Sequence, residues 1–161
     1  MLIDQSSKLW QYLPLEQREL IEDCEKLVGE AQSHPQKLSD YSYLVFPVAK
    51  MYEGFLKKLF LDLGLVNQER YQSEHFRIGS ALNPHLPEHL KMESLYDQVL
   101  SHLKNQSVVD SLWLAWKVGR NSLFHYFPGR VQMVSLDEAK GIIEEIIEAM
   151  SLAISFSRPS I

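Results

Sequence analysis

The sequence predicts an all-α fold, a helical bundle with four to five main helices. Apolar residues recur at spacings of three and four along most of the chain, as on the buried stripe of an amphipathic helix. No segment shows the apolar–polar alternation that is typical of half-buried strands. At 161 residues and 45% hydrophobic, the chain can bury one sizeable core. We therefore expect a single domain over residues 1–161, with an N-terminal helix and linker at 1–39 and a core bundle at 40–157.

The first two helices are predicted at about 14–32 and 40–62. Pro14 suits the first turn of the first helix, because a proline there loses no intrahelical hydrogen bond. In the second helix, Pro47 either lies in the first turns or kinks the helix, and Gly64 is a suitable C-cap. Their predicted buried stripes are Leu20, Cys24, Leu27, Val28 and Ala31, and Leu44, Val48, Met51, Phe55, Leu59 and Leu63.

Residues 65–91 are predicted to form a long connection. The segment contains Gly79, Pro84 and Pro87, and we expect at most a short helix in it, near 68–76. Connections of this length inside a compact domain are often functional.

The C-terminal half predicts three further helices. The first covers about 92–104, and the second starts near Ser107 and stops before Pro128. The last opens with a capping box, in which Ser135 and Glu138 satisfy each other's backbone donors. Its predicted buried stripe is Ala139, Ile142, Ile143, Ile146, Ile147, Met150 and Ile154.

Charge is segregated along the sequence. The formal net charge is −5, which argues against binding nucleic acid through an extended basic surface. However, no acidic residue occurs between Asp110 and Asp137. The basic residues and histidine of that window are Lys117, Arg120, His125 and Arg130.

Several classes of protein are excluded by composition. The single Cys24 is incompatible with a disulfide framework or a cysteine-based zinc site. The N-terminus lacks the basic and apolar regions of a signal peptide, and the longest apolar run, 43–49, is too short to span a bilayer. The sequence therefore predicts a soluble cytoplasmic protein without a membrane partner.

Arg120 and His125 are the residues that best fit a chemical role. A guanidinium stays charged and presents a planar fork to phosphate oxygens, so it can stabilise negative charge in a transition state. An imidazole titrates near neutrality and can accept or deliver a proton. In RNA the 2′-hydroxyl supplies a nucleophile next to the phosphate. This pair suits phosphodiester cleavage that needs no metal and no cofactor.

The spacing of the pair constrains its geometry. Positions five apart differ by about 140° around a straight helix and by roughly 7.5 Å along it. Arg120 and His125 can therefore converge only in a groove, at a distorted helical turn, or across an interface with another chain. Apolar residues that could supply such an interface, and so favour a site built from two copies, are Leu123, Phe124, Tyr126 and Phe127.

Two stretches carry a resemblance to a known family. The segment 120–125, R-N-S-L-F-H, resembles the Arg-(four to six residues)-His signature of HEPN domains, in which a polar residue such as Asn121 commonly follows the arginine. The segment 46–59 looks like the preceding helix of RNase LS-type toxins, where an acidic residue accompanies the Arg/His pair, and Glu53 matches that position. The resemblance covers about residues 40–156.

The resemblance implies an HEPN-like bundle that dimerises, and a metal-independent endoribonuclease of toxin-like or defence-related function. His125 would transfer a proton or orient the 2′-hydroxyl, Arg120 would stabilise the phosphate, and Glu53 would orient one of them. The expected partners are RNA, a second copy of the chain and an antitoxin protein. Expected supporting residues are Asn121 and Tyr126, and expected RNA contacts are Lys117 and Arg130.

Other interpretations of Arg120, His125 and Glu53 remain open. The domain is alternatively a non-catalytic HEPN-like dimer that binds RNA, a nucleotide or a partner protein, or a purely structural helical protein. Arg120 would then cap a helix end and His125 would be an ordinary histidine. Glu53 has Lys57 four residues later, so a helix-face ion pair is the simpler explanation for both.

Two further motifs have structural explanations. His85 to His89 matches the H-x-x-E-H zinc signature, but that signature needs a regular helix, which Pro87 disfavours. We expect a loop there, and no metal site, although the roles of both histidines stay open. Trp113 and Trp116 could stack on bases, but their helical spacing favours core or dimer contacts.

Overall fold

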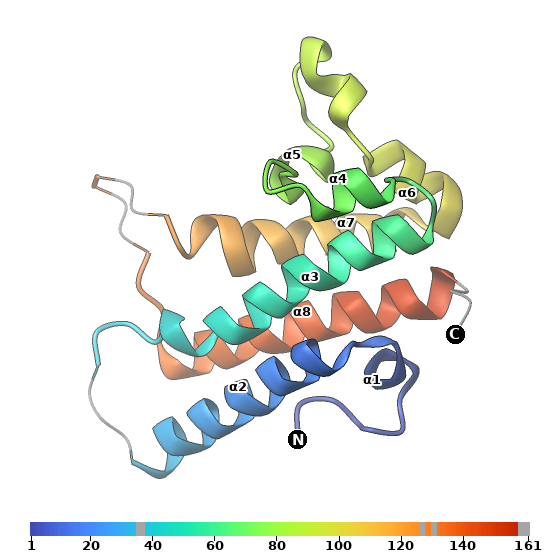
Figure 1. Cartoon of the computed structure of the whole chain (residues 1–161). Helices are drawn as coiled ribbons and strands as arrows, with labels where there is room; N and C mark the ends of the chain where they lie inside the picture. The colour runs from blue at the N-terminus through green and yellow to red at the C-terminus, as the bar shows by residue number, and fades with distance from the viewer. Residues whose placement is uncertain (35–37, 126–127, 130–131, 158–161) are drawn as a thin grey trace.

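The computed structural model describes residues 1–34, 38–125, 128–129 and 132–157 (Figure 1). Within these residues helices predominate and no strand occurs, so the all-α prediction is confirmed. The α-helices are α1 (Lys8–Tyr12), α2 (Leu15–Ser33), α3 (Phe46–Asp62), α4 (Gln68–Gln72), α5 (Ile78–Ala81), α6 (Tyr96–Leu103), α7 (Gln106–Trp116) and α8 (Leu136–Ser157). They are joined by two 3-10 helices, η1 (Ser42–Leu44) and η2 (Glu88–Glu93), and by a π-helical turn, η3 (Lys117–Ser122).

The four long helices α2, α3, α7 and α8 build the bundle. α2 packs against α3 and α7 against α8, while α8 also contacts α3 and α1 (Figure 1). The buried hydroxyl of Tyr52 on α3 donates a hydrogen bond of 2.8 Å to the carbonyl oxygen of Leu112 on α7. Buried side chains from Ile3 to Ile154 belong to one hydrophobic cluster. We therefore propose that the N-terminal segment and the bundle fold as one domain. No helix in the described ranges is long and apolar enough to cross a membrane.

The predicted start of the second long helix was six residues too early. Asp40 accepts hydrogen bonds of 3.1 Å from the backbone N–H groups of Ser42 and Val134. Short polar side chains that bind nearby backbone in this way compete with helix formation. The chain therefore forms the turn η1 first, and Pro47 lies in the first turn of α3, where it is tolerated. Gly64 follows α3 with a φ of +70°, as predicted for a C-cap.

The connection 65–91 contains more helix than the sequence predicted. Asn67 is the N-cap of α4, and its side chain accepts a hydrogen bond of 2.8 Å from Arg70 N. α5 follows, with Ile78 and Ala81 buried. Helices this short are unstable alone. Burial holds α5 against the bundle, and in α4 the partly buried side chain of Tyr71 packs against the core. The connection is thereby placed beside α3 and α7.

Capping explains where two later helices begin. The side chain of Asn105 accepts a hydrogen bond from Val108 N at the start of α7. Before α8, Ser135 N donates to a carboxylate oxygen of Glu138 at 2.7 Å, and Glu138 N donates to Ser135 Oγ at 3.3 Å. The predicted capping box is confirmed. The helix before α7, α6, is shorter than predicted, because η2 and Ser94 occupy the residues where its first turn was expected.

Candidate functional site

A distorted turn carries the candidate arginine. The sequence predicted one helix from Ser107 to before Pro128, but α7 ends at Trp116 and continues as the π-helical turn η3. Turns of this kind insert an extra residue and are frequent at functional sites. Gly119, within the turn, is buried against α8: a Cβ there would lie 2.5 Å from Cδ1 of Ile146. Only a glycine lets the backbone approach α8 this closely, and this approach sets the position of the next residue, Arg120.

Arg120 is held by a carboxylate that lies 67 residues earlier in the chain. Its Nη2 donates to Oε2 of Glu53 on α3 at 3.3 Å. The Nζ of Lys57 lies 3.5 Å from the other oxygen, Oε1, of Glu53. The helix-face ion pair and the pairing with the arginine therefore coexist. The Arg120 and Glu53 side chains are 36% and 30% exposed, so the pair stays accessible to a ligand.

Two aromatic rings flank the same guanidinium. Its central carbon is 5.9 Å from the ring centroid of Trp116 and 6.0 Å from that of Phe124. Contacts of this kind between a cation and an aromatic face are weakly attractive and restrict the orientation of the guanidinium. Arg120 is therefore positioned from three sides before any ligand binds.

Arg120 and His125 line one pocket of about 430 Å³. Glu53 reaches this pocket from α3 and Asn121 from η3, and His125 follows the turn as an exposed residue. Most of the remaining lining comes from α7 and from the connection that contains α5. The full lining is Glu53, Phe76, Arg77, Ile78, Gly79, Ser80, Asn83, Trp113, Trp116, Arg120, Asn121 and His125.

Not every predicted site residue lies in this pocket. Lys117 is exposed at the start of η3 and is absent from the pocket lining. Tyr126 and Arg130 lie outside the described residues. Trp113 is half-buried and Trp116 is buried, as predicted for core contacts, yet both also form a wall of the pocket.

The sequence did not predict which residues of the 65–91 connection line the pocket. Arg77, Ser80 and Asn83 line the pocket, but the sequence predicted only that a connection of this length is often functional. Gly79 lets α5 lie close to α7, since a Cβ on it would be 3.0 Å from Nε1 of Trp116. The sequence cue was weak: Gly79 and Ser80 follow Arg77 after one intervening residue, Ile78.

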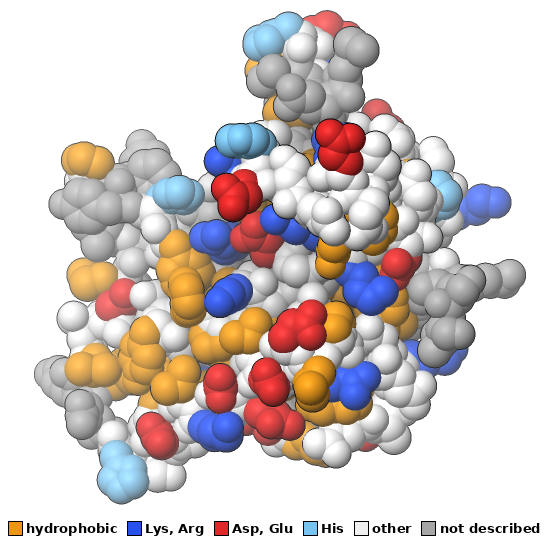
Figure 2. All heavy atoms as spheres, in the orientation of Figure 1, with side chains coloured by type: hydrophobic (Ala, Val, Ile, Leu, Met, Phe, Trp, Pro, Cys, Tyr) orange, Lys and Arg blue, Asp and Glu red, His pale blue; other side chains and the backbone are white. Residues whose placement is uncertain are grey.

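A second pocket, of about 420 Å³, lies on the other side of the Glu53–Arg120 pair. Lys50 and Lys57 contribute basic groups, and its apolar part includes Phe46, which is 54% exposed and packs edge-on against Phe124 with ring centroids 5.7 Å apart. Figure 2 shows hydrophobic side chains gathered near the N-terminal end of α3, with basic and acidic side chains interspersed further along this face. The ion pair thus separates a polar pocket from a more apolar one.

The structure has a loop at His85 to Pro87, as predicted, whereas Glu88 and His89 begin the 3-10 helix η2. His85 N donates to the side chain of Asn83 at 2.9 Å, Pro87 precedes the short η2, and Glu88 pairs with Lys91 at 2.6 Å. In the part of the chain that the structure describes, no group of three or more His, Cys, Asp or Glu side chains is arranged to hold a metal ion.

A comparison with known families supports the sequence resemblance. Residues 18–126 match the family described as "RNase LS, bacterial toxin DBD domain". The matched range is about two-thirds of the chain and includes Glu53, Arg120 and His125. The chain belongs to this family.

Membership of the RNase LS toxin DBD family confirms the predicted similarity to RNase LS-type toxins and indicates a toxin-type function. No match was found among curated proteins or solved structures. The helix α8, which packs beneath η3 of this RNase LS toxin DBD domain, lies beyond the matched range.

Proposed function

We propose that this domain is a metal-independent endoribonuclease of the HEPN type, acting as a toxin. The observation that carries the proposal is that Arg120 and His125 line one pocket, with Glu53 bound to Arg120. A guanidinium and an imidazole beside the same space suffice for RNA cleavage through the 2′-hydroxyl. Membership of a bacterial toxin family supports this function.

Arg120 would bind the scissile phosphate. During attack the phosphoryl oxygens gain negative charge, and a guanidinium already fixed beside them stabilises that charge without reorganising. Glu53 acts as a positioning residue, because its carboxylate holds one edge of the guanidinium at 3.3 Å. Asn121, from the same turn, would add a polar group to the phosphate or ribose.

His125 would move the protons. The 2′-oxygen attacks phosphorus, its proton passes to an imidazole, and the bond between phosphorus and the 5′-oxygen breaks. The leaving 5′-oxygen then takes a proton, so cleavage needs both a base and an acid. A second copy of the chain would bring a second His125, and the two imidazoles would divide these tasks.

Pairing of two copies is part of the proposal. The exposed aromatic ring of Phe46 and its neighbour Phe124 lie directly beside the Arg120 site. An apolar surface next to a charged pocket is suited to burial between two copies. We further propose that Tyr126 supports the site, that Lys117 and Arg130 contact RNA, and that an antitoxin protein inhibits the domain.

The reaction products test this function. We expect the purified chain to cleave total bacterial RNA in the presence of EDTA, leaving 2′,3′-cyclic phosphate and 5′-hydroxyl ends. Mass spectrometry of the fragments identifies both ends, and labelling with polynucleotide kinase without prior phosphatase treatment confirms the free 5′-hydroxyl.

Two outcomes would contradict the mechanism. Fragments with 5′-phosphate ends would indicate that water, and not the 2′-hydroxyl, attacks phosphorus. Cleavage that appears only with added divalent metal would require a different active site. RNA that is bound and left intact would favour the alternative of a non-catalytic dimeric module.

A further inference from the structure

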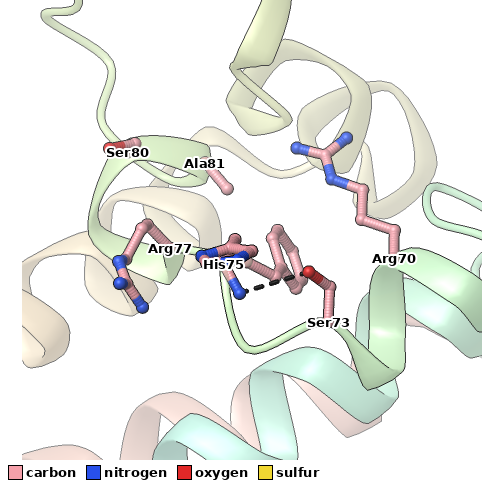
Figure 3. Close-up of a pocket in the computed structure, with 7 residues that line it drawn as sticks. Arg70, Ser73, His75, Arg77, Ser80 and Ala81 are labelled. Carbon is pink, nitrogen blue, oxygen red and sulfur yellow. Dashed lines mark hydrogen bonds between the residues drawn. The ribbon is translucent and has the colours of Figure 1, made fainter.

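A basic pocket adjoins the Arg120/His125 pocket. It has a volume of about 390 Å³ and is formed by the connection after α3. In Figure 3, Arg70 and Arg77 lie on opposite sides of it, with His75 and Ser73 between them. The backbone N–H of His75 donates to Ser73 Oγ at 3.2 Å, which fixes the turn between the two arginines.

The two pockets share a wall. Phe76, Arg77 and Ser80 line both of them, so a ligand chain can pass from one to the other along these residues. Phe76 is buried, and its ring packs 6.4 Å from that of Phe60 on α3, which fixes the shared wall against the bundle. The basic pocket is therefore a continuation of the site that contains Arg120.

The charged groups of this pocket suit an anion. Arg77 is exposed; one of its nitrogens donates to the carbonyl oxygen of Glu74 at 2.8 Å, and it has no ion-pair partner among the residues described. The guanidinium of Arg70 stacks on the ring of Phe76 at 4.8 Å, which holds it at the pocket edge. Arginine binds phosphate in a bidentate manner, and the hydroxyls of Ser73 and Ser80 are additional donors.

We propose that the Arg70/Arg77 pocket binds the phosphodiester backbone of the RNA substrate beside the bond that is cleaved. The inference rests on the proposed ribonuclease function, which it extends from the scissile phosphate to a neighbouring one. A net acidic protein needs such local sites, because its overall field repels RNA. We expect the pocket to bind backbone and not bases, since arginine and hydroxyl donors are the groups that commonly contact phosphate oxygens.

Binding of an RNA that cannot be cleaved tests the pocket independently of catalysis. The probe is a mixed-sequence single-stranded RNA with 2′-O-methyl groups throughout, and its affinity is measured at several salt concentrations. We expect R70A/R77A to weaken binding roughly tenfold at low salt and to reduce the salt slope by about 1.4, since each phosphate contact on a single strand contributes about 0.7. The matched control, K8A/K26A, removes two positive charges from α1 and α2, on the far side of α3 from α4 (Figure 1), and should change neither value appreciably.

Cleavage of substrates of two lengths distinguishes a subsite from a catalytic defect. The variant is R70A, because Arg70 lines the basic pocket and not the Arg120/His125 pocket. For a long RNA, R70A should raise KM about threefold and leave kcat within about a factor of two. For a dinucleotide, whose one phosphate is the scissile one, the same variant should cleave as fast as the wild type.

Each remaining outcome is informative. Affinity and salt slope unchanged in R70A/R77A, together with cleavage that depends on Arg120, would overturn the subsite and leave the ribonuclease intact. If R70A/R77A lost binding and the wild type cleaved no RNA, the ribonuclease function would be contradicted, but a pocket for the RNA backbone would be supported. Competition by inorganic phosphate or a nucleoside monophosphate as effective as that by RNA would overturn the inference, because the pocket would then bind a small free anion.

Discussion

Replacing either Arg120 or His125 by alanine should lower the rate of RNA cleavage by about 10²–10⁴-fold. Arg120→Ala removes the positive charge beside the phosphate and leaves the carboxylate of Glu53 facing it. In the proposed mechanism, His125→Ala removes the imidazole that would transfer the proton. Because the two groups act in one transition state, the double variant should be little slower than the worse single variant.

Single-turnover cleavage of a labelled RNA measures these rates, and growth of bacteria that express each variant provides a second readout. His102→Ala on α6 and Lys26→Ala on α2 are matched controls, since both residues are exposed and lie outside the pocket lining. The controls should retain wild-type cleavage and growth arrest. Cleavage that survives in the double Arg120/His125 variant would show that the chemistry lies elsewhere.

Gly119→Ala should destabilise the domain by about 1–3 kcal/mol, in spite of the higher helix propensity of alanine. The added Cβ would lie 2.5 Å from Cδ1 and 3.0 Å from Cγ1 of Ile146, a side chain that is itself buried in the core. The π-helical turn must then move away from α8, and Arg120 moves with it. We therefore expect weaker cleavage as well as a lower free energy of unfolding, measured by chemical denaturation.

The chain offers a matched control for this steric effect. Gly29 lies in α2, and apart from the neighbouring backbone of α2 itself no atom lies within 4 Å of the position of a Cβ. Gly29→Ala should therefore raise stability, by up to about 1 kcal/mol. Ile146→Val removes Cδ1, the atom nearest to the clash, and should partly rescue Gly119→Ala when the two are combined. If Gly119→Ala and Gly29→Ala gave equal stability changes, close packing of the turn on α8 would not hold.

The sequence predicts the long helices well, because their cues are local. Pro14 and the Ser135/Glu138 box lie at the start of the helices that they cap, and the apolar stripe of α8 lies within α8 itself. The helices α1 and α5 escaped prediction because both are short and depend on packing against the bundle. The late start of α3 depends on the side chain of Asp40 binding Val134, a contact between residues far apart in the sequence.

In the candidate site, too, the local features could be predicted from the sequence and the contacts between distant residues could not. The spacing of Arg120 and His125 required a groove, a distorted turn or an interface, and the structure shows a distorted turn beside a shared pocket. Spacing alone could not indicate that Glu53 contacts Arg120; that position came from the family resemblance. The contribution of Arg77 could not be predicted, because it depends on how the 65–91 connection folds back over α3 and α7.

In the proposed mechanism, RNA is cleaved in the pocket of Arg120 and His125 by attack of the RNA's own 2′-hydroxyl. The most direct measurement uses an oligonucleotide that spans the main cleavage position, with a single 2′-deoxy nucleotide at the attacking ribose. We expect the deoxy substrate to bind with an affinity similar to that of the unmodified RNA and to remain uncut in EDTA. Cleavage of the deoxy substrate at the same bond and a similar rate would contradict this mechanism.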